Sequence, residues 1–200
     1  MISLGTFFWL MVSFFALVGA LRGWTKEVIA TSGLILSLFF LNYFGAEILG
    51  FLSGVGNTTN AAGDILPIER RHFYFLASIH LVITFFSYQG PVIAGSRISG
   101  RLRVRDSLQD KFMGAIIGAL NGYLIIGAIW AFLEYRIIER SNWQQLSPGV
   151  QYPFAASVIV RPEVGSTLAS LIENLPLPIL APYLPILVVA AFIFVIVVMI

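Results

Sequence analysis

The 200-residue chain is 58% hydrophobic and only 11% charged, and its formal net charge is +2. A soluble domain usually carries about 25% charged residues, and a disordered chain combines low hydrophobicity with high charge. Both classes are therefore excluded, and the composition indicates an integral membrane protein with no room for a separate soluble catalytic domain. The sequence contains no cysteine, which excludes disulfides, thiolate metal sites and cysteine nucleophiles.

Four long apolar runs and one shorter run predict an all-α fold, a polytopic helical membrane bundle with short amphipathic segments. A transmembrane helix needs about 20 predominantly apolar residues. The four predicted spans are Leu4–Leu21, Val28–Leu52, Phe73–Ile93 and Phe112–Phe132. A fifth hydrophobic helix is expected over Ile186–Ile200, with Leu184 and Pro185 entering the membrane ahead of it.

The segments between these runs predict how the helices are connected. Arg22–Glu27 is a short polar turn in which Gly23 can end a helix, so the first two spans are expected to be antiparallel neighbours. Glu134–Leu175 has apolar pieces that are too short to span, and we expect them to lie on the membrane surface or to pack on the bundle. The proline-rich Leu175–Pro185 is expected to be an extended lead-in to the last helix.

Lys and Arg are distributed unevenly between the two sides of the predicted bundle. Arg22–Glu27 and Ser96–Lys111 hold seven of the 12 Lys and Arg, including Arg97, Arg101, Arg103 and Arg105. Because cytoplasmic loops carry an excess of Lys and Arg, this side is predicted to be cytoplasmic and the N-terminus to be outside. Ser96–Lys111 is either an interfacial helix against anionic headgroups or a plain basic loop that sets topology.

Three glycines recur every fourth residue on one face of the fourth span. Gly114, Gly118 and Gly122 have no side chains, so they allow another helix to approach to backbone contact. The face can serve packing within the bundle or homodimerisation, and both interpretations are open. Asp110 is well placed to cap this helix. Gly127 lies outside the repeat, so a larger side chain is expected to disrupt the bundle less there than at Gly118.

The order of these features resembles a known family. A first helix ending in Arg22-Gly23, a second hydrophobic helix, and a basic segment leading into Asp110-Lys111 and the glycine repeat resemble the colicin V production protein (CvpA) family. Asn121 stands where many members of that family carry a basic residue. The resemblance covers about residues 1–176, the membrane domain, and leaves 177–200 as the proline-rich lead-in and C-terminal hydrophobic helix.

The resemblance implies a protein of the bacterial inner membrane that assists bacteriocin production or export, or envelope maintenance. The family has no established catalytic residues, so we expect neither an enzyme nor a cofactor. Expected partners are the lipid bilayer, other envelope or secretion proteins and a second copy of the chain, with no nucleic acid. We also expect no metal site, because His72 and His80 are too far apart along a helix to share an ion.

Polar residues inside the spans support a second hypothesis. Asn42, His80 and Asn121 lie within predicted membrane helices, where polar groups are costly and often functional. If they line a wet path, the protein is a small channel or a proton-coupled transporter that uses His80. The alternative for His80 is a neutral histidine bonded to a neighbouring helix, and this favours a scaffold.

Overall fold

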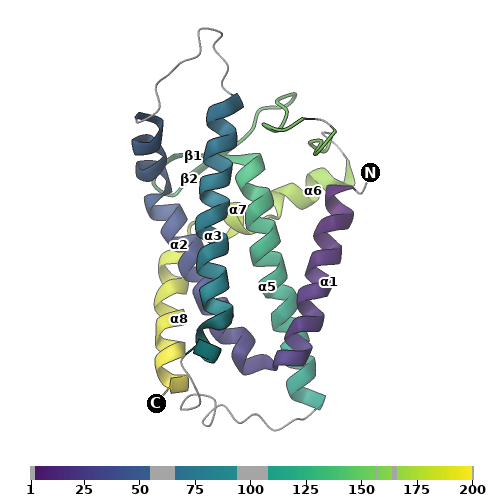
Figure 1. Ribbon diagram of the computed structural model, residues 1–200, viewed down its shortest axis with the longest axis vertical. Coiled ribbons are helices and arrows are strands. Elements are labelled where there is room, and N and C mark those ends of the chain that lie inside the picture. Colours follow the sequence, from purple (N-terminus) through teal and green to yellow (C-terminus); the bar gives the residue numbers. More distant parts are fainter. Residues whose placement is uncertain (1–2, 55–65, 94–107, 156, 164–165, 200) are drawn as a thin grey trace.

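The computed structural model describes residues 3–54, 66–93, 108–155, 157–163 and 166–199, and most of these are helical (Figure 1). Among these described residues, four helices are long and apolar enough to cross a membrane, so the predicted all-α membrane bundle is confirmed. They are α1 (Leu4–Arg22), α2 (Trp24–Gly54), α3 (Leu66–Ile93) and α5 (Leu108–Glu134). The predicted basic segment Ser96–Lys111, with its four arginines, lies outside the described residues as far as residue 107.

The turn between the first two helices is shorter than the sequence predicted. Arg22 ends α1, Trp24 begins α2, and only Gly23 lies outside a helix, so the expected six-residue turn is wrong. The first two helices are also not the main neighbours of one another. After the bend α2 turns away from α1 and packs on α3, α5 and the C-terminal helix, while α1 packs along α5 (Figure 1).

The glycine face of α5 is the surface on which α1 lies. A Cβ atom added to Gly118 would lie 2.9 Å from the Cα atom of Gly19, and one added to Gly122 would lie 3.1 Å from the Cα atom of Val12. Gly114 meets the Gly19 backbone in the same way, 3.0 Å from its carbonyl carbon. The two backbones therefore touch along three turns of α5, which side chains of any size would prevent.

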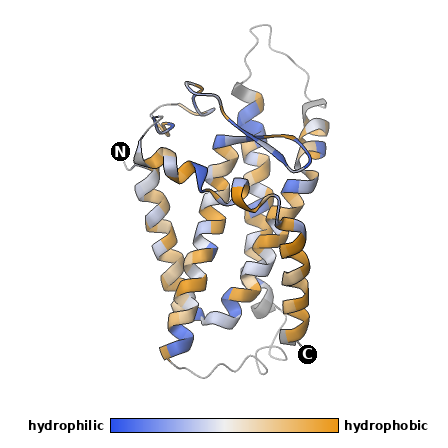
Figure 2. Cartoon of the chain, turned by 180° about the vertical axis from the view of Figure 1, so that it is seen from behind, coloured by the Kyte–Doolittle hydropathy of each residue, from blue (hydrophilic) through white to orange (hydrophobic). Residues whose placement is uncertain are grey.

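The region after α5 contains a small hairpin that the sequence analysis did not predict. Strands β1 (Tyr135–Glu139) and β2 (Asn142–Gln145) pair antiparallel, and Ser141 has a φ of 60° in the turn between them. Figure 2 shows this hairpin lying across one end of the bundle, with polar residues along it. It forms a lid over the ends of the long helices.

Short helices connect this lid to the C-terminal helix. The short helices are α6 (Thr167–Glu173) and α7 (Pro176–Leu180), and the C-terminal helix is α8 (Leu184–Met199). The expectation of an extended lead-in over Leu175–Pro185 is wrong, because Pro176 occupies the first helical position, where no backbone N–H is needed. The α6–α7 segment and α8 meet at 66°. With 16 residues, α8 is about 24 Å long, which is short of a full span.

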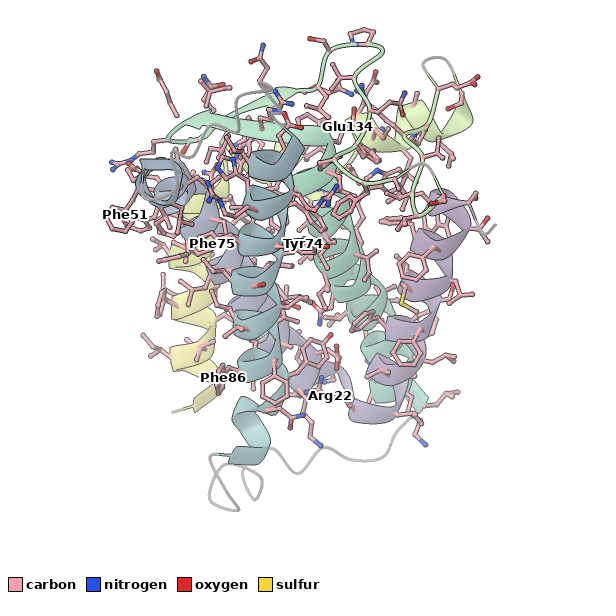
Figure 3. The ribbon with its side chains drawn as sticks, turned by 45° about the horizontal axis from the view of Figure 1, so that its top comes forward. Arg22, Phe51, Tyr74, Phe75, Phe86 and Glu134 are labelled. Atoms are coloured by element: carbon pink, nitrogen blue, oxygen red, sulfur yellow. The ribbon has the colours of Figure 1, made fainter. Side chains whose placement is uncertain are left out.

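Apolar side chains fill the inside of the bundle and also cover its outside. Leu34, Leu38 and Leu41 of α2 are completely buried between the helices. Large apolar residues such as Phe51 and Phe86 are exposed on the outer faces (Figure 3). Figure 2 shows α8 as apolar along almost its whole length. A helical surface of this kind fits a lipid environment, in which exposed apolar side chains carry no penalty.

Replacing Gly118 with leucine should disrupt the bundle, whereas Gly50→Leu should leave it intact. Gly118 touches the α1 backbone, while a Cβ atom at Gly50 of α2 would meet nothing within 4 Å. Gly127 does not serve as the tolerant control, because a Cβ atom there would lie 2.6 Å from Cδ of Pro176. The measurement is folded yield and thermal stability in detergent. Equal loss, or equal tolerance, of the two variants would contradict the role of the glycine face.

Candidate functional site

A buried ion pair lies where α1 meets α2. Arg22 is the last residue of α1 and Glu27 stands in the first turn of α2, and Nη1 of Arg22 lies 2.9 Å from Oε1 of Glu27. The Glu27 side chain is completely buried, while that of Arg22 is 20% exposed. A carboxylate in the first turn is favoured by the helix dipole. Its burial is tolerable only because an opposite charge and hydrogen-bond donors surround it.

Residues of two further helices complete the surroundings of this carboxylate. Oε2 of Glu27 accepts hydrogen bonds from the Tyr88 hydroxyl at 3.1 Å and from Nδ2 of Asn121 at 2.8 Å. Nδ2 of Asn121 also donates to the Glu27 carbonyl at 3.0 Å, and the Thr31 hydroxyl donates to Oδ1 of Asn121 at 2.7 Å. We call Arg22, Glu27, Thr31, Tyr88 and Asn121 the Arg22–Glu27 cluster.

Arg22 ties the cluster to α3 as well. Its Nη2 donates to the Tyr88 carbonyl at 2.9 Å, and its guanidinium carbon lies 4.3 Å from the centre of the Tyr88 ring. A cation over an aromatic face is attracted by the electron-rich ring. Figure 3 shows Arg22 at one end of the bundle. The cluster thus joins α1, α2, α3 and α5 through one carboxylate.

Gly23 and Asp110 fix the bend beside this cluster. Gly23 has φ 84° and ψ 155°, a backbone conformation that is essentially restricted to glycine. A Cβ atom at Gly23 would also lie 2.6 Å from Oδ2 of Asp110. Oδ1 of Asp110 accepts the backbone N–H of Trp24 at 3.2 Å, so the carboxylate of α5 caps α2. The sequence analysis had expected Asp110 to cap its own helix.

The predicted motif residues therefore meet at one end of the bundle. Asp110 of α5 contacts Gly23, the residue that follows Arg22. Lys111 is exposed instead. Sequence reasoning placed Glu27 in a turn and so missed its role. It also missed Tyr88 and Thr31. One signal was available, because Glu27 and Thr31 are four residues apart and share a helical face in an otherwise apolar segment.

His80 lies in the middle of the bundle, apart from the Arg22–Glu27 cluster. Its Nδ1 lies 2.9 Å from the Ser37 hydroxyl, and its ring contacts Phe132 edge to face at 5.9 Å. The side chain is completely buried. This arrangement is a polar contact between α2 and α3 inside an apolar core.

Asn42 belongs to a third group of contacts, at the hairpin end. Its Nδ2 donates to the Ser141 hydroxyl at 3.0 Å, and its Oδ1 accepts from Nε1 of Trp143 at 2.8 Å. The backbone N–H of Ser141 also donates to the Asn42 carbonyl at 2.9 Å. Asn42 therefore holds the hairpin turn on α2. The three intramembrane polar candidates, Asn42, His80 and Asn121, are thus distributed over three separate contacts.

A second buried ion pair connects the end of α5 to the loop that follows the hairpin, and sequence reasoning missed it. Glu134, the last residue of α5, is completely buried and lies at the opposite end from Arg22 (Figure 3). Its Oε2 accepts from Nε of Arg161 at 3.1 Å and from the Tyr152 hydroxyl at 2.9 Å. Arg161 also donates to the carbonyls of Ser147 and Val150, so one side chain connects the end of α5 to two positions of the loop.

The protonation of Tyr152 fits this arrangement. Burial and then the nearby Glu134 charge raise the pKa of Tyr152 above its usual range, so the hydroxyl remains a donor to the carboxylate. The same two causes raise the pKa of Tyr135 to about 12. An acid at a helix C-terminus opposes the helix dipole. The position of Glu134 at the C-terminus of an apolar helix was therefore a signal in the sequence that a cation lies next to it.

The described residues contain no group of three or more His, Asp or Glu side chains that could hold a metal ion. The buried polar groups instead connect helices to one another and to the lid. The Arg22–Glu27 cluster joins four helices through buried charges and hydrogen bonds, and the Glu134–Arg161 pair joins α5 to a loop at the other end. We call these two groups of contacts the buried joints.

The four apolar spans and their buried joints define a multi-pass membrane protein. Residues 5–159 match the family model described as Colicin V production protein. The chain therefore belongs to the colicin V production protein family. No curated protein and no solved structure matches the chain. The matched region contains both joints except for Arg161, and it ends before α6, α7 and α8.

Arg22→Gln should destabilise the protein much more than Arg140→Gln. Removing one partner of a buried ion pair costs about 3 kcal/mol because it leaves an unpaired buried charge. The Arg140–Glu47 pair is 3.0 Å long, but its side chains are 54% and 51% exposed, and such pairs contribute at most about 1 kcal/mol. The measurement is the free energy of unfolding in mixed detergent micelles. A similar loss for both variants would show that the Arg22–Glu27 pair is not a structural joint.

Proposed function

We propose that this protein is a scaffold of the bacterial inner membrane that assists bacteriocin production or secretion, or envelope maintenance. Membership of the colicin V production protein family supports the general role. On this proposal the protein is not an enzyme and uses no cofactor. It acts on other envelope or secretion proteins through its surface, while its interior holds the bundle in shape.

The proposal rests on one observation, that these polar groups inside the bundle form hydrogen bonds with one another and with the hairpin. Glu27 and Asn121 bind one another and their neighbours, and Asn42 binds the hairpin. Between these groups Leu34 and Leu38 are completely buried. Polar contacts of this kind join membrane helices. They support a packed bundle that works as a platform more than they support a path for an ion or a solute.

The position of the glycine face limits how two copies of the chain can associate. Gly114, Gly118 and Gly122 are covered by α1 of the same chain. A homodimer that used this face would first have to displace α1. We therefore propose that partners, including a second copy, bind other surfaces of the bundle.

The proposed topology can be tested directly, because the chain contains no cysteine. Gln144 in the hairpin and Lys111 at the start of α5 are both exposed, at opposite ends of the bundle. A membrane-impermeant thiol reagent should label Gln144→Cys in intact cells and Lys111→Cys only after permeabilisation. The reason is the excess of Lys and Arg on the Lys111 side. Labelling of Lys111→Cys in intact cells would overturn the orientation.

The scaffold role predicts that His80→Leu and Asn42→Leu largely keep function. The His80–Ser37 contact joins two membrane helices, and such a contact contributes on average about 0.6 kcal/mol, so its loss should not unfold the bundle. Asn42→Leu removes hydrogen bonds to the hairpin and leaves the contacts among the long helices in place. The measurement is complementation of a deletion strain for secretion and envelope phenotypes, with protein abundance determined in parallel. Loss of function by His80→Leu at normal abundance would overturn the scaffold and favour a proton-coupled transporter, since histidine titrates near neutral pH.

A further inference from the structure

A pocket of about 270 Å³ lies under the lid, at the end of the bundle opposite the Arg22–Glu27 cluster. Its apolar walls come from four elements, with Leu49 from α2, Leu76 from α3, Phe132 from α5 and Ile137 from β1. The hairpin crosses this end of the bundle (Figure 2), and Ile137 of β1 lines the pocket. The pocket is therefore built by parts of the chain that are distant in sequence, unlike a groove along one helix.

The size of the pocket and its apolar walls fit an apolar ligand. Protein interiors are close-packed and leave few voids, and an apolar cavity of about 150 Å³ already accepts benzene. Leu49 and Ile68 lie within a turn of the ends of two apolar spans of the structure, which finish at Leu52 and begin at Ile68. The pocket is thus at the level where hydrocarbon gives way to headgroups.

The charged residues that line the pocket form one ion pair, and two further arginines lie next to it on α3. Glu69, His72 and Arg136 line it beside the apolar walls. Arg136 is paired with Glu69, and its side chain is still 49% exposed, so part of the guanidinium faces outward. Arg70 and Arg71 follow Glu69 on α3 and are also exposed. Arg136 and Glu69 neutralise one another, so Arg70 and Arg71 provide the excess positive charge at the mouth of the pocket. This charge attracts an anion, and arginine binds phosphate and carboxylate groups particularly well.

We propose that this pocket binds one acyl chain of an anionic amphiphile. The hydrocarbon lies against Leu76 and Phe132, and the phosphate or carboxylate headgroup lies near Arg136. The ligand is either an anionic phospholipid of the membrane or a free fatty acid, which share this chemistry. The inference goes beyond the proposed scaffold role and does not depend on it.

Photolabelling of the full chain in phosphatidylcholine vesicles tests the proposal. Three probes carry a diazirine near the end of an acyl chain: phosphatidylglycerol, a free fatty acid and phosphatidylcholine. Leu76 and Phe132 are 3% and 6% exposed, so bulk lipid does not reach them. We expect an anionic probe to label peptides containing these residues about fivefold more than the phosphatidylcholine probe does, the factor expected from one arginine near a headgroup. Labelling by phosphatidylglycerol identifies a phospholipid ligand, and labelling by the fatty acid alone identifies a free acid.

Variants of the pocket sharpen this test. Leu76→Trp fills the pocket and should abolish labelling at Phe132, whereas Leu81→Trp, on the exposed face of the same helix, should not. Ile137→Trp fills the pocket from the hairpin if Leu76→Trp does not fold. Arg136→Gln should remove the preference for the anionic probes. The proposal is overturned if Phe132 is labelled equally in the filled and the control variants, or if no probe labels it in the unmodified chain. Equal labelling by phosphatidylcholine and the anionic probes also overturns it.

Discussion

The Glu27 carboxylate imposes the constraint on which the rest of the bundle depends. It is completely buried at the end of four apolar helices, where an isolated charge would be very costly. Each of its neighbours comes from a different helix: Arg22 from α1, Tyr88 from α3 and Asn121 from α5. Satisfying this one charge therefore places all four helices relative to one another. Apolar packing alone does not fix such a register, because lipid tails compete equally well for apolar side chains.

The other features of this end follow from the same requirement. Arg22 reaches Glu27 because the chain reverses over a single residue, and Gly23 makes that bend possible. Asp110 then caps the exposed start of α2, which fixes α5 against the bend. From there the glycines of α5 continue the contact by allowing α1 to lie directly on its backbone. The order of helix, bend, acid and glycine repeat is thus one connected piece of structure.

Composition and hydropathy were sufficient to predict the four spans, because a bilayer requires long apolar runs. The glycine repeat also predicted a close helix contact, although not that α1 would provide it. Glu27 was placed in a turn because it follows Arg22 and Gly23 in a polar string, and only the structure shows that the string lies in α2. The hairpin over Tyr135–Gln145 was missed because it is held on the bundle by Asn42, about 100 residues away in the sequence. Leu175–Pro185 was misjudged because prolines permit a helix at its first turn, which composition does not reveal.

Two buried ion pairs at opposite ends of the bundle connect its helices to one another and to the loop that follows the hairpin. The claim that Glu27 organises the bundle is tested most directly by a double-mutant cycle. Arg22→Gln and Glu27→Gln are combined, and the free energy of unfolding is measured for both single variants and the double variant. The account predicts a coupling energy of about 2 kcal/mol, because Arg22→Gln costs little once the carboxylate is neutral. Purely additive losses would show that the two side chains act independently and would contradict the account.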